Sequence, residues 1–462
     1  MSAVTTTPAP RLAADLLKSQ AFIGGAFVDA SDGRTFAVTD PADGSVITEV
    51  ADCSAADTER AVEAAADAFP KWAKLTAKER SKILRAWNDL MIARADDLGA
   101  ILAREQGKPF AEARGEIIYG ASFIEWFAEE ARRVYGDIIP ANLPGRQIVA
   151  LKQPIGVTAA ITPWNFPNAM ITRKVGPALA VGCTSIVKPA GETPLSALAI
   201  AQLGIEAGIP AGVFSVLPTA RTREVGAVLT GHPTVRKVSF TGSTEVGRVI
   251  MRQSAETIKK LSLELGGNAP FIVFDDADLD AAVAGAMASK YRNTGQTCVC
   301  ANRFYVQAGV YDAFAAKLTQ AVQAMKVGPA FEPGVSQGPL INKKAVDKVV
   351  ELVGDATGKG GRALTGGKPH VLGGLFFEPT VLVDVPRDAR LLTEEIFGPV
   401  APLVKFETEE EVIALANDSE FGLASYFYSR DIGRVWRVAA ALESGIVGVN
   451  EGLVSTTEAP FG

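Results

Sequence analysis

Hydrophobic positions recur with a helical spacing in the N-terminal part of the chain. The stretches Ala55–Phe69, Thr76–Gln106 and Ala111–Val134 are rich in Ala, Glu, Arg and Leu, and their spacing predicts three helices. Thr76 and Glu79 stand three residues apart at the start of the second stretch, which is the spacing of a capping box. We therefore expect this part of the chain to be mainly helical.

After Gly136 short β-branched runs alternate with Ala- and Leu-rich stretches. Strands are predicted at Gly156–Ile161, Thr184–Val187, Val213–Leu217, Lys237–Phe240 and Phe271–Phe274, and helices at Ser196–Ala207, Arg223–Leu229, Thr244–Ala255 and Leu279–Tyr291. This alternation predicts an α/β fold with parallel sheets and crossover helices. A second alternation follows Arg303, and the hydrophilic stretch Gly354–Lys368 is expected to be a surface loop or helix end.

Composition narrows the class of protein. The length of 462 residues favours two or three domains, and 46 basic against 52 acidic residues give a net charge of −6. Because no basic block stands out, we expect no nucleic-acid partner. Met1–Gln20 lacks the apolar core of a signal peptide, and the uncharged stretch before Arg173 contains three prolines, so we expect a cytoplasmic protein without a membrane partner.

Scarce histidine and cysteine exclude several kinds of site. The chain has 2 histidines and 4 cysteines, which argues against a His-rich zinc site, a Ser-His-Asp hydrolase and a disulfide scaffold. No metal is predicted. The P-loop pattern fails because Gly367 stands where its lysine should be, and G-x-G-x-x-G is absent. Asp276, Asp278 and Asp280 are interpreted as helix-capping residues rather than a calcium loop.

Three residues stand out as candidates for chemistry. Cys298 ends a polar, turn-rich stretch that contains Gly295; the residues alone leave a reactive and a structural cysteine equally open. Glu264 lies between two leucines, where burial raises a carboxyl pKa and favours a base near neutrality. Asn165 provides an amide donor in the rigid loop Pro163–Pro167.

Further motifs suggest a nucleotide site. Lys188 follows a predicted strand, and Phe240–Ser243 joins a strand to a helix. The N-terminus of such a helix offers free N–H groups and a positive dipole to a pyrophosphate. Glu394–Pro399 forms another distinctive run.

These motifs, in this order, resemble the aldehyde dehydrogenase superfamily from roughly Phe22 to Gly462. The resemblance is closer still to the NAD(P)-dependent succinate-semialdehyde dehydrogenases, and it rests on Ser122–Glu130, Met170–Lys174, Leu261–Asp280 and Gly295–Arg303. It implies a Rossmann-like cofactor domain without G-x-G-x-x-G, an α/β catalytic domain and a β-hairpin oligomerisation arm.

The resemblance also implies domain boundaries. We expect a cofactor-binding domain over residues 1–135 and 153–263, the oligomerisation hairpin over 136–152, the catalytic domain over 264–450 and a substrate-loop segment over 451–462. Relatives usually continue beyond the position of Gly462, so the last strand of the arm is expected to follow it. Relatives of this kind form homodimers or homotetramers.

Roles for the three candidates follow from the same resemblance. Cys298 matches the nucleophile that attacks an aldehyde to give a thiohemiacetal and then a thioester. The Asn165 amide, with the Cys298 backbone N–H, matches the group that holds the oxyanion. Glu264 matches the base that activates water for hydrolysis of the thioester.

Cofactor residues are likewise implied by resemblance. They are Trp164, Lys188, Ala190, Gly191, Gly242, Ser243, Leu265, Glu395 and Phe397. NAD-selective relatives commonly place a glutamate three residues after the strand-end lysine, where it would repel a 2′-phosphate. That position is Gly191 here, with Glu192 one step later, so NADP is favoured over NAD, and use of both stays open.

Arg173, Arg292 and Ser455 match the residues that bind a distal substrate carboxylate in the succinate-semialdehyde subgroup. Structural ion pairs remain the alternative for the two arginines, and glutarate semialdehyde or another short aldehyde remains an alternative substrate. Two rival functions remain. The enzyme could transfer the acyl group of the thioester to coenzyme A or phosphate, or the protein could be a catalytically silent binding or structural member of the superfamily.

Cys300, two residues after the nucleophile, is a candidate redox partner in a Cys298–Cys300 disulfide, with a bystander thiol as the alternative.

Overall fold

Helices dominate the chain between residues 55 and 130 in the computed structural model, which describes residues 11–461. They are α1 (Ala55–Lys74), α2 (Ala77–Ala93), α3 (Ala95–Gln106) and α4 (Phe110–Glu130). The predicted capping box of Thr76 and Glu79 is present. The single helix predicted over Thr76–Gln106 is wrong: it is two helices, and Arg94 between them leaves the helical conformation at φ −107° and ψ 21°. Hydrophobic spacing continues across this break and does not reveal it.

The first of two large sheets mixes parallel and antiparallel strands. Its order is β11 (Lys260–Glu264), β10 (Val235–Thr241), β7 (Val157–Ile161), β8 (Thr184–Lys188), β9 (Phe214–Val216), β1 (Ala21–Ile23) and β2 (Ala26–Val28). The five strands from β11 to β9 are parallel, and β1 and β2 are antiparallel. The first four strands predicted after Gly136 lie in this sheet, whereas β1 and β2 were not predicted.

Crossover helices accompany the first sheet, as the α/β prediction requires. They are α5 (Ala169–Ala180), α6 (Leu195–Glu206), α7 (Thr222–Gly231) and α8 (Thr244–Ala255). Trp72 and Trp87 are fully buried, and their indole N–H groups donate to the carbonyls of Leu179 at 3.1 Å and Ile200 at 2.9 Å. The N-terminal helices are thereby packed onto α5 and α6.

The second large sheet is formed by the C-terminal half of the chain. Its order is β14 (Arg362–Thr365), β15 (Thr380–Val383), β16 (Val400–Phe406), β13 (Ala301–Gln307), β12 (Ala269–Val273), β17 (Ala424–Tyr428) and β18 (Ile446–Val449). Its helices are α9 (Leu279–Lys290), α10 (Tyr311–Gln323), α11 (Lys343–Gly358), α12 (Glu409–Asn417) and α13 (Ile432–Ala441). Asp278 caps α9, as interpreted from the sequence. The stretch Gly354–Lys368 contains the end of α11, as expected, but also the edge strand β14.

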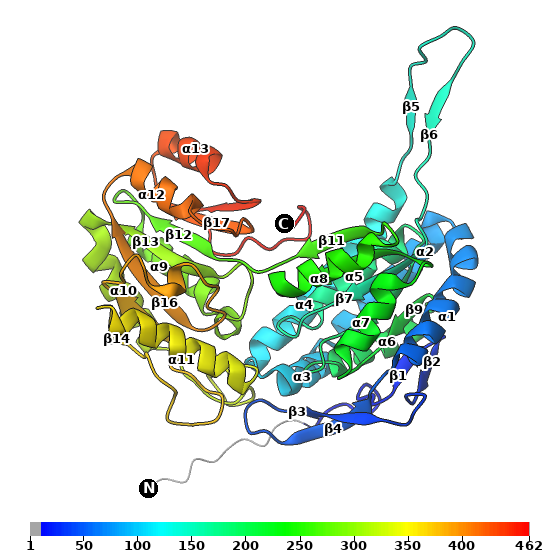
Figure 1. Ribbon diagram of the computed structural model, residues 1–462, viewed down its shortest axis with the longest axis horizontal. Helices are drawn as coiled ribbons and strands as arrows, with labels where there is room; N and C mark the ends of the chain where they lie inside the picture. The colour runs from blue at the N-terminus through cyan, green and yellow to red at the C-terminus, as the bar shows by residue number, and fades with distance from the viewer. Residues whose placement is uncertain (1–10, 462) are drawn as a thin grey trace.

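Two hairpins stand apart from these sheets. The strands β3 (Thr35–Thr39) and β4 (Val46–Ala51) form one hairpin, and β5 (Asp137–Ile139) and β6 (Ile148–Ala150) form the other. Figure 1 shows the β5–β6 hairpin projecting as an arm from the lobe of the first sheet. Its apolar side chains are exposed, with Ile138 at 88% and Val149 at 57%.

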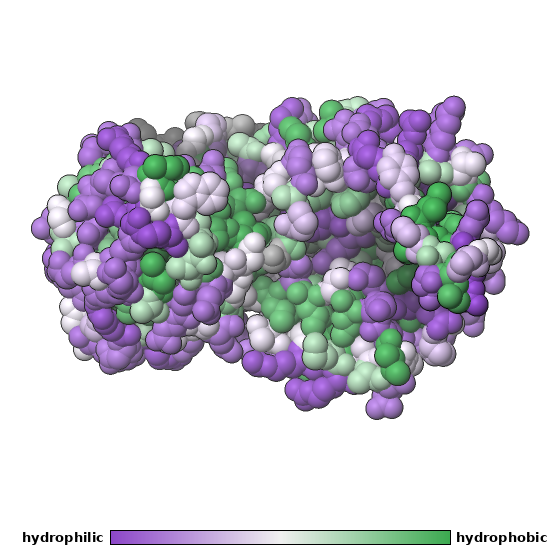
Figure 2. Space-filling view, turned by 90° about the horizontal axis from the view of Figure 1, so that it is seen from above, coloured by the Kyte–Doolittle hydropathy of each residue, from purple (hydrophilic) through white to green (hydrophobic). Residues whose placement is uncertain are grey.

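Three strands of the first sheet end near the region between the two lobes, which are the parts of the molecule built around the first and the second large sheet. The strands β7, β10 and β11 end at Ile161, Thr241 and Glu264, and each is followed by a loop. In parallel α/β sheets, ligands bind at these carboxyl ends. Figure 2 shows the surface hollowed in this region, with apolar side chains gathered near the junction of the lobes.

Candidate active site

Cys298 is placed by a strained turn between α9 and β13. Asn293, Thr294 and Gly295 have φ values of 52°, 57° and 74°, a left-handed conformation that favours glycine. At Gly295 a Cβ atom would lie 2.2 Å from the Gly398 carbonyl oxygen, so only glycine fits there. The turn places Cys298 between two cavities. Cys298 is 8% exposed and lines both of them.

The larger cavity beside Cys298 brings together six of the nine predicted cofactor residues. It measures about 480 Å³ and includes Trp164, Gly242, Ser243, Leu265, Glu395 and Phe397 in its wall. Ser243 caps α8 by accepting from the Val246 N–H at 3.4 Å, which leaves N–H groups at this helix end for a pyrophosphate. A Cβ at Gly242 would lie 2.5 Å from the Phe240 ring. The wall therefore fits a dinucleotide.

A neighbouring cavity of about 320 Å³ continues this site, sharing Glu192 and Ile341 with the first. Gly191 also lies in its wall, but Lys188 and Ala190 line neither cavity. The Lys188 ammonium donates to the Pro189 carbonyl at 2.9 Å, and burial lowers its pKa to about 8. Two carboxylates, those of Glu105 and Glu192, lie in the wall of this cavity; Glu192 is next to Gly191, and Glu105 accepts from the backbone N–H groups at the start of α6.

On its other side Cys298 faces a narrow cavity that contains all three predicted substrate residues. Its wall consists of Tyr119, Phe166, Met170, Arg173, Arg292, Thr297, Cys298, Val299, Ser455 and Phe461. The open volume is about 10 Å³, which is roughly the space of one water molecule. The side chains of this wall therefore leave little free space beside Cys298 in this structure.

Arg173 has hydrogen-bonding capacity left for a ligand. Its Nη2 donates to the Tyr119 hydroxyl at 2.7 Å, and its guanidinium lies 4.7 Å from the ring centroids of Phe123 and Phe461. Its Nε and Nη1 atoms are buried and have no partner among the residues described. Because buried donors are normally satisfied, this geometry suits an incoming carboxylate.

Glu264 ends β11 and is half-buried. Burial raises the pKa of its carboxyl group, and the nearby charges of Lys174 and Arg173 oppose the rise. Burial also lowers the pKa of Lys174 to about 7. Although it lines neither cavity, Glu264 is close enough for its charge to raise the pKa of Cys298. The expected shift of Glu264 toward neutrality is confirmed in direction.

Asn165 is buried, 3% exposed, in the loop after β7. Its Nδ2 donates to the Gln296 carbonyl at 2.9 Å, which ties this loop to the turn that carries Cys298. An amide nitrogen has two N–H groups, so one remains for a ligand oxygen in the larger cavity, which Asn165 and Cys298 both line.

The surroundings of the Cys298 thiol favour its protonated form. Burial raises its pKa to about 11, and the negative charges of Glu395 and Glu264 contribute, while Arg173 and Arg292 oppose them. The two arginines favour the thiolate, and burial and the two glutamates oppose it.

This protonation predicts how Cys298 reacts with iodoacetamide in the ligand-free enzyme. Since only the thiolate reacts, the alkylation rate should rise about tenfold per pH unit, or about a hundredfold from pH 7 to pH 9. Mass spectrometry of the Cys298 peptide measures it, with glutathione as the control thiol. A Cys298 rate that levels off below pH 9 would contradict the assignment.

Cys300 points into the protein interior rather than into either cavity. Its Sγ lies 3.6 Å from the Lys290 carbonyl and 3.4 Å from the Ala301 carbonyl, and it is buried, with 3% exposed. Its thiol is free in this state. A redox role for Cys300 stays a prediction.

The apolar walls of the substrate cavity escaped sequence reasoning. Tyr119, Phe166, Met170 and Phe461 line it, and they come from three separate parts of the chain, since only Phe166 and Met170 are near each other in sequence. Aromatic residues and methionine are common in any core, so only the fold brings these four together around Cys298.

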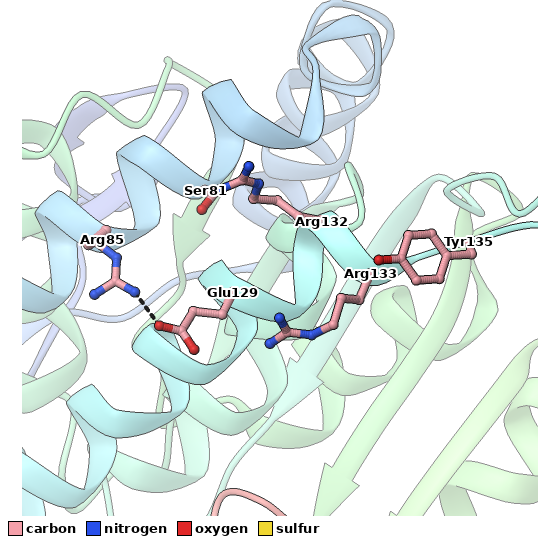
Figure 3. Close-up of a pocket in the computed structure, with 6 residues that line it drawn as sticks. All are labelled: Ser81, Arg85, Glu129, Arg132, Arg133 and Tyr135. Atoms are coloured by element: carbon pink, nitrogen blue, oxygen red, sulfur yellow. Dashed lines mark hydrogen bonds and ion pairs between the residues drawn. The ribbon is translucent and has the colours of Figure 1, made fainter.

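A larger hollow lies away from this site, at the foot of the arm. It measures about 550 Å³ and is lined by Ser81, Arg85, Glu129, Arg132, Arg133 and Tyr135 (Figure 3). Arg85 pairs with Glu125 and Glu129, and Arg133 pairs with Glu130. These glutamates offset the charges of Arg85 and Arg133, and we assign no activity to this hollow.

The described residues contain neither a metal-binding cluster nor a membrane-spanning helix. Within residues 11–461, no group of three or more His, Cys, Asp or Glu side chains is arranged to hold a metal ion. No helix in the same described segment has both the length and the apolar character needed to cross a membrane.

Comparison with known proteins agrees with this geometry. The family model described as "Aldehyde dehydrogenase family" matches residues 27–462. The chain is 62% identical to the glutarate-semialdehyde dehydrogenase of Pseudomonas aeruginosa, covering 97% of this chain and 93% of that protein. It is 60% identical to the NADP(+) succinate-semialdehyde dehydrogenase of Escherichia coli, again covering 97% and 93%.

A solved structure gives the same result for the fold. The crystal structure of succinate-semialdehyde dehydrogenase from Burkholderia pseudomallei superposes with a TM-score of 0.96 at 61% identity, covering 97% of this chain and 93% of that one. The chain belongs to the aldehyde dehydrogenase family, and the predicted fold class is confirmed.

Proposed function

We propose that this protein oxidises succinate semialdehyde to succinate with NADP or NAD as the hydride acceptor, with glutarate semialdehyde as the alternative substrate. The observation that carries the proposal is the shared wall of one cavity, in which Cys298 lies together with Arg173, Arg292 and Ser455. An aldehyde held at its carboxylate end by arginines presents its carbonyl group to the nucleophile.

In the proposed mechanism the Cys298 thiol first gives its proton to solvent, and the thiolate attacks the aldehyde carbon to form a thiohemiacetal. The free N–H of Asn165 and the backbone N–H of Cys298 stabilise the negative charge on the carbonyl oxygen. The cavity wall with Gly242, Ser243 and Phe397 would hold the cofactor, which when bound would accept the hydride from the thiohemiacetal carbon, so that Cys298 carries a thioester. Glu264 then takes a proton from water, and the water attacks the thioester to release the acid.

The presence of Glu264 favours water over coenzyme A or phosphate as the final acceptor. Its carboxyl group has a raised pKa, which suits a base working near neutral pH. A catalytically silent member of the family would have no use for Cys298, Glu264 and Asn165 together. The two rival functions are therefore less well supported.

The choice of cofactor follows from the wall of the neighbouring cavity. Gly191 lies in that wall and brings no charge, while Glu192 lies in both cavities. A carboxylate held against the ribose would repel a 2′-phosphate, and Glu192 is one residue away from the position where such a carboxylate acts. We propose NADP as the preferred cofactor, and the Escherichia coli relative is named as an NADP(+) enzyme.

The domain division and the oligomer also remain proposals. We propose that residues 1–135 and 153–263 bind the cofactor, that 264–450 form the catalytic domain and that 451–462 contribute to the substrate site. The arm over 136–152 exposes apolar side chains such as Ile138, which an aqueous surface disfavours. This exposure supports a homodimer or homotetramer that covers them.

Replacing Arg173 by alanine tests the substrate class. We expect kcat/KM for succinate and glutarate semialdehyde to fall at least tenfold, about 1.4 kcal/mol, because the carboxylate loses its bidentate partner. An uncharged aldehyde of the same length should be oxidised at nearly the wild-type rate. NADPH or NADH formation measures both.

The matched control for this prediction is Arg132→Ala, which removes an exposed arginine at the foot of the arm. It should leave both substrates unaffected. An equal loss on charged and uncharged aldehydes in Arg173→Ala would show that Arg173 is structural, and absence of activity in the wild type on either semialdehyde would refute the proposed function.

A further inference from the structure

Three charged side chains near the active site take no part in the proposed chemistry. Lys108 precedes α4, and Glu112 and Glu116 follow at intervals of four residues on its first turns. The side chains of Lys108 and Glu116 are each 1% exposed, and their Nζ and Oε2 atoms are 2.6 Å apart. Burying such an ion pair is costly, and apolar residues of similar volume would often be at least as stable. Stability alone is therefore a weak reason for charges at these positions.

Lys108 and Glu116 form hydrogen bonds with the loop that carries Asn165. The Lys108 ammonium donates to the Asn165 carbonyl at 2.7 Å and lies 4.0 Å from the centroid of the Phe166 ring. The other oxygen of Glu116 accepts from the Asn168 N–H at 2.9 Å, where α5 begins. The loop is thus held at Asn165 and again three residues later.

The same group holds the turn that carries Cys298. Glu112 accepts from the Asn293 N–H at 2.7 Å, which is the first left-handed residue of that turn. The Asn293 side chain in turn donates to the Asn165 carbonyl at 2.9 Å. One carbonyl oxygen therefore receives a charged donor from Lys108 and an amide donor from the nucleophile's own turn, and these two bonds fix the residue whose side chain is proposed to hold the oxyanion.

We propose that Lys108 is a positioning residue for Asn165. Its ammonium fixes the Asn165 backbone, so that the side-chain amide stands at the place where the oxyanion develops, and Glu116 and Glu112 hold the two loops in register. This inference rests on the proposed function. It predicts that Lys108 acts on catalysis through Asn165 and through no other group.

Two variants remove the positioning charge. Lys108→Met leaves Glu116 buried without its partner, and such a change is strongly destabilising. The double variant Lys108→Met/Glu116→Gln removes both charges and keeps an acceptor for the Asn168 N–H. We expect the double variant to keep a melting temperature close to wild type, while kcat for semialdehyde oxidation falls about ten- to a hundredfold, since small misplacements of catalytic groups have effects of that size.

The decisive measurement repeats the double change in an Asn165→Ala background. Asn165→Ala alone should lower kcat by about 10² to 10³, and adding the double change should then lower it less than twofold, because the group that Lys108 positions is already gone. The alkylation rate of Cys298 by iodoacetamide should stay within twofold of wild type in the double variant, since that reaction forms no oxyanion.

The outcomes separate the two proposals. If Asn165→Ala lowers kcat, and the double change lowers kcat further by the same factor as in the wild-type background, Lys108 is not a positioning residue for Asn165. An unchanged kcat in the double variant would likewise exclude the positioning role. If Asn165→Ala itself leaves kcat unchanged, the oxyanion role in the proposed function fails, and the role of Lys108 falls with it.

Discussion

Cys298→Ala should lower kcat for semialdehyde oxidation by at least about 10⁴-fold, because it removes the group that forms the covalent intermediate. The carbonyl cannot be converted to a thiohemiacetal without that sulfur, and no other cysteine lines either cavity beside it. Steady-state formation of NADPH or NADH at saturating aldehyde measures the loss. Binding of the cofactor, followed by fluorescence quenching, should change little, because the substitution removes one sulfur atom from the wall.

Cys300→Ala provides the matched control, since it removes a buried thiol two residues away. We expect this variant to keep most of the wild-type kcat, because the Cys300 sulfur contacts backbone carbonyls outside the cavities. Substantial oxidation by Cys298→Ala, or equal losses in the two variants, would contradict the assignment of the nucleophile.

Glu264→Gln should separate formation of the thioester from its hydrolysis. We expect a rapid burst of about one NADPH per active site, followed by a steady state lowered about 10²- to 10⁴-fold, because general acid–base catalysis contributes effects of that size. Stopped-flow absorbance measures both phases. A loss of the burst together with the steady state would mean that Glu264 acts before the thioester forms.

The same variant predicts a change in pH dependence. Burial raises the Glu264 pKa above its usual 4.5, so the ionised fraction of wild-type Glu264 falls as the pH drops through this raised value. Hydrolysis in the wild type should therefore slow on the acid side at a pH above 4.5, and Glu264→Gln should lose that limb. Glu129→Gln, on the exposed face of α4, is the matched control and should keep it.

How much of this site could be predicted from sequence depends on the kind of signal each residue gives. Cys298 and Glu264 stand in unusual local settings, so patterns and resemblance were sufficient to single them out. Lys108, Glu112 and Glu116 belong to an ordinary charged helix start, and nothing local distinguishes a buried ion pair from a solvated one. Only the fold shows that these charges are inside and which loops they hold.

The predicted cofactor residues also differ in how well the sequence could place them. Gly242 and Ser243 form a strand-to-helix turn, which has a local signature and lies in the wall as predicted. Lys188 was carried over by resemblance, and its ammonium instead bonds to the Pro189 carbonyl in this state. Side-chain direction depends on neighbours that are distant in sequence.

The short edge strands β1 and β2 could not be predicted from the sequence pattern. With three residues each, they are too short to show an alternating pattern.

The central claim, a thioester on Cys298 derived from a semialdehyde that bears a carboxylate, is tested most directly by trapping. Glu264→Gln enzyme is mixed with succinate semialdehyde and NADP, quenched in acid during the burst, digested and analysed by mass spectrometry. The account predicts a succinyl group on Cys298, close to one per active site, and none when Cys298 is replaced by alanine. A burst without an acyl group, or an acyl group on Cys300 or another residue, would contradict it.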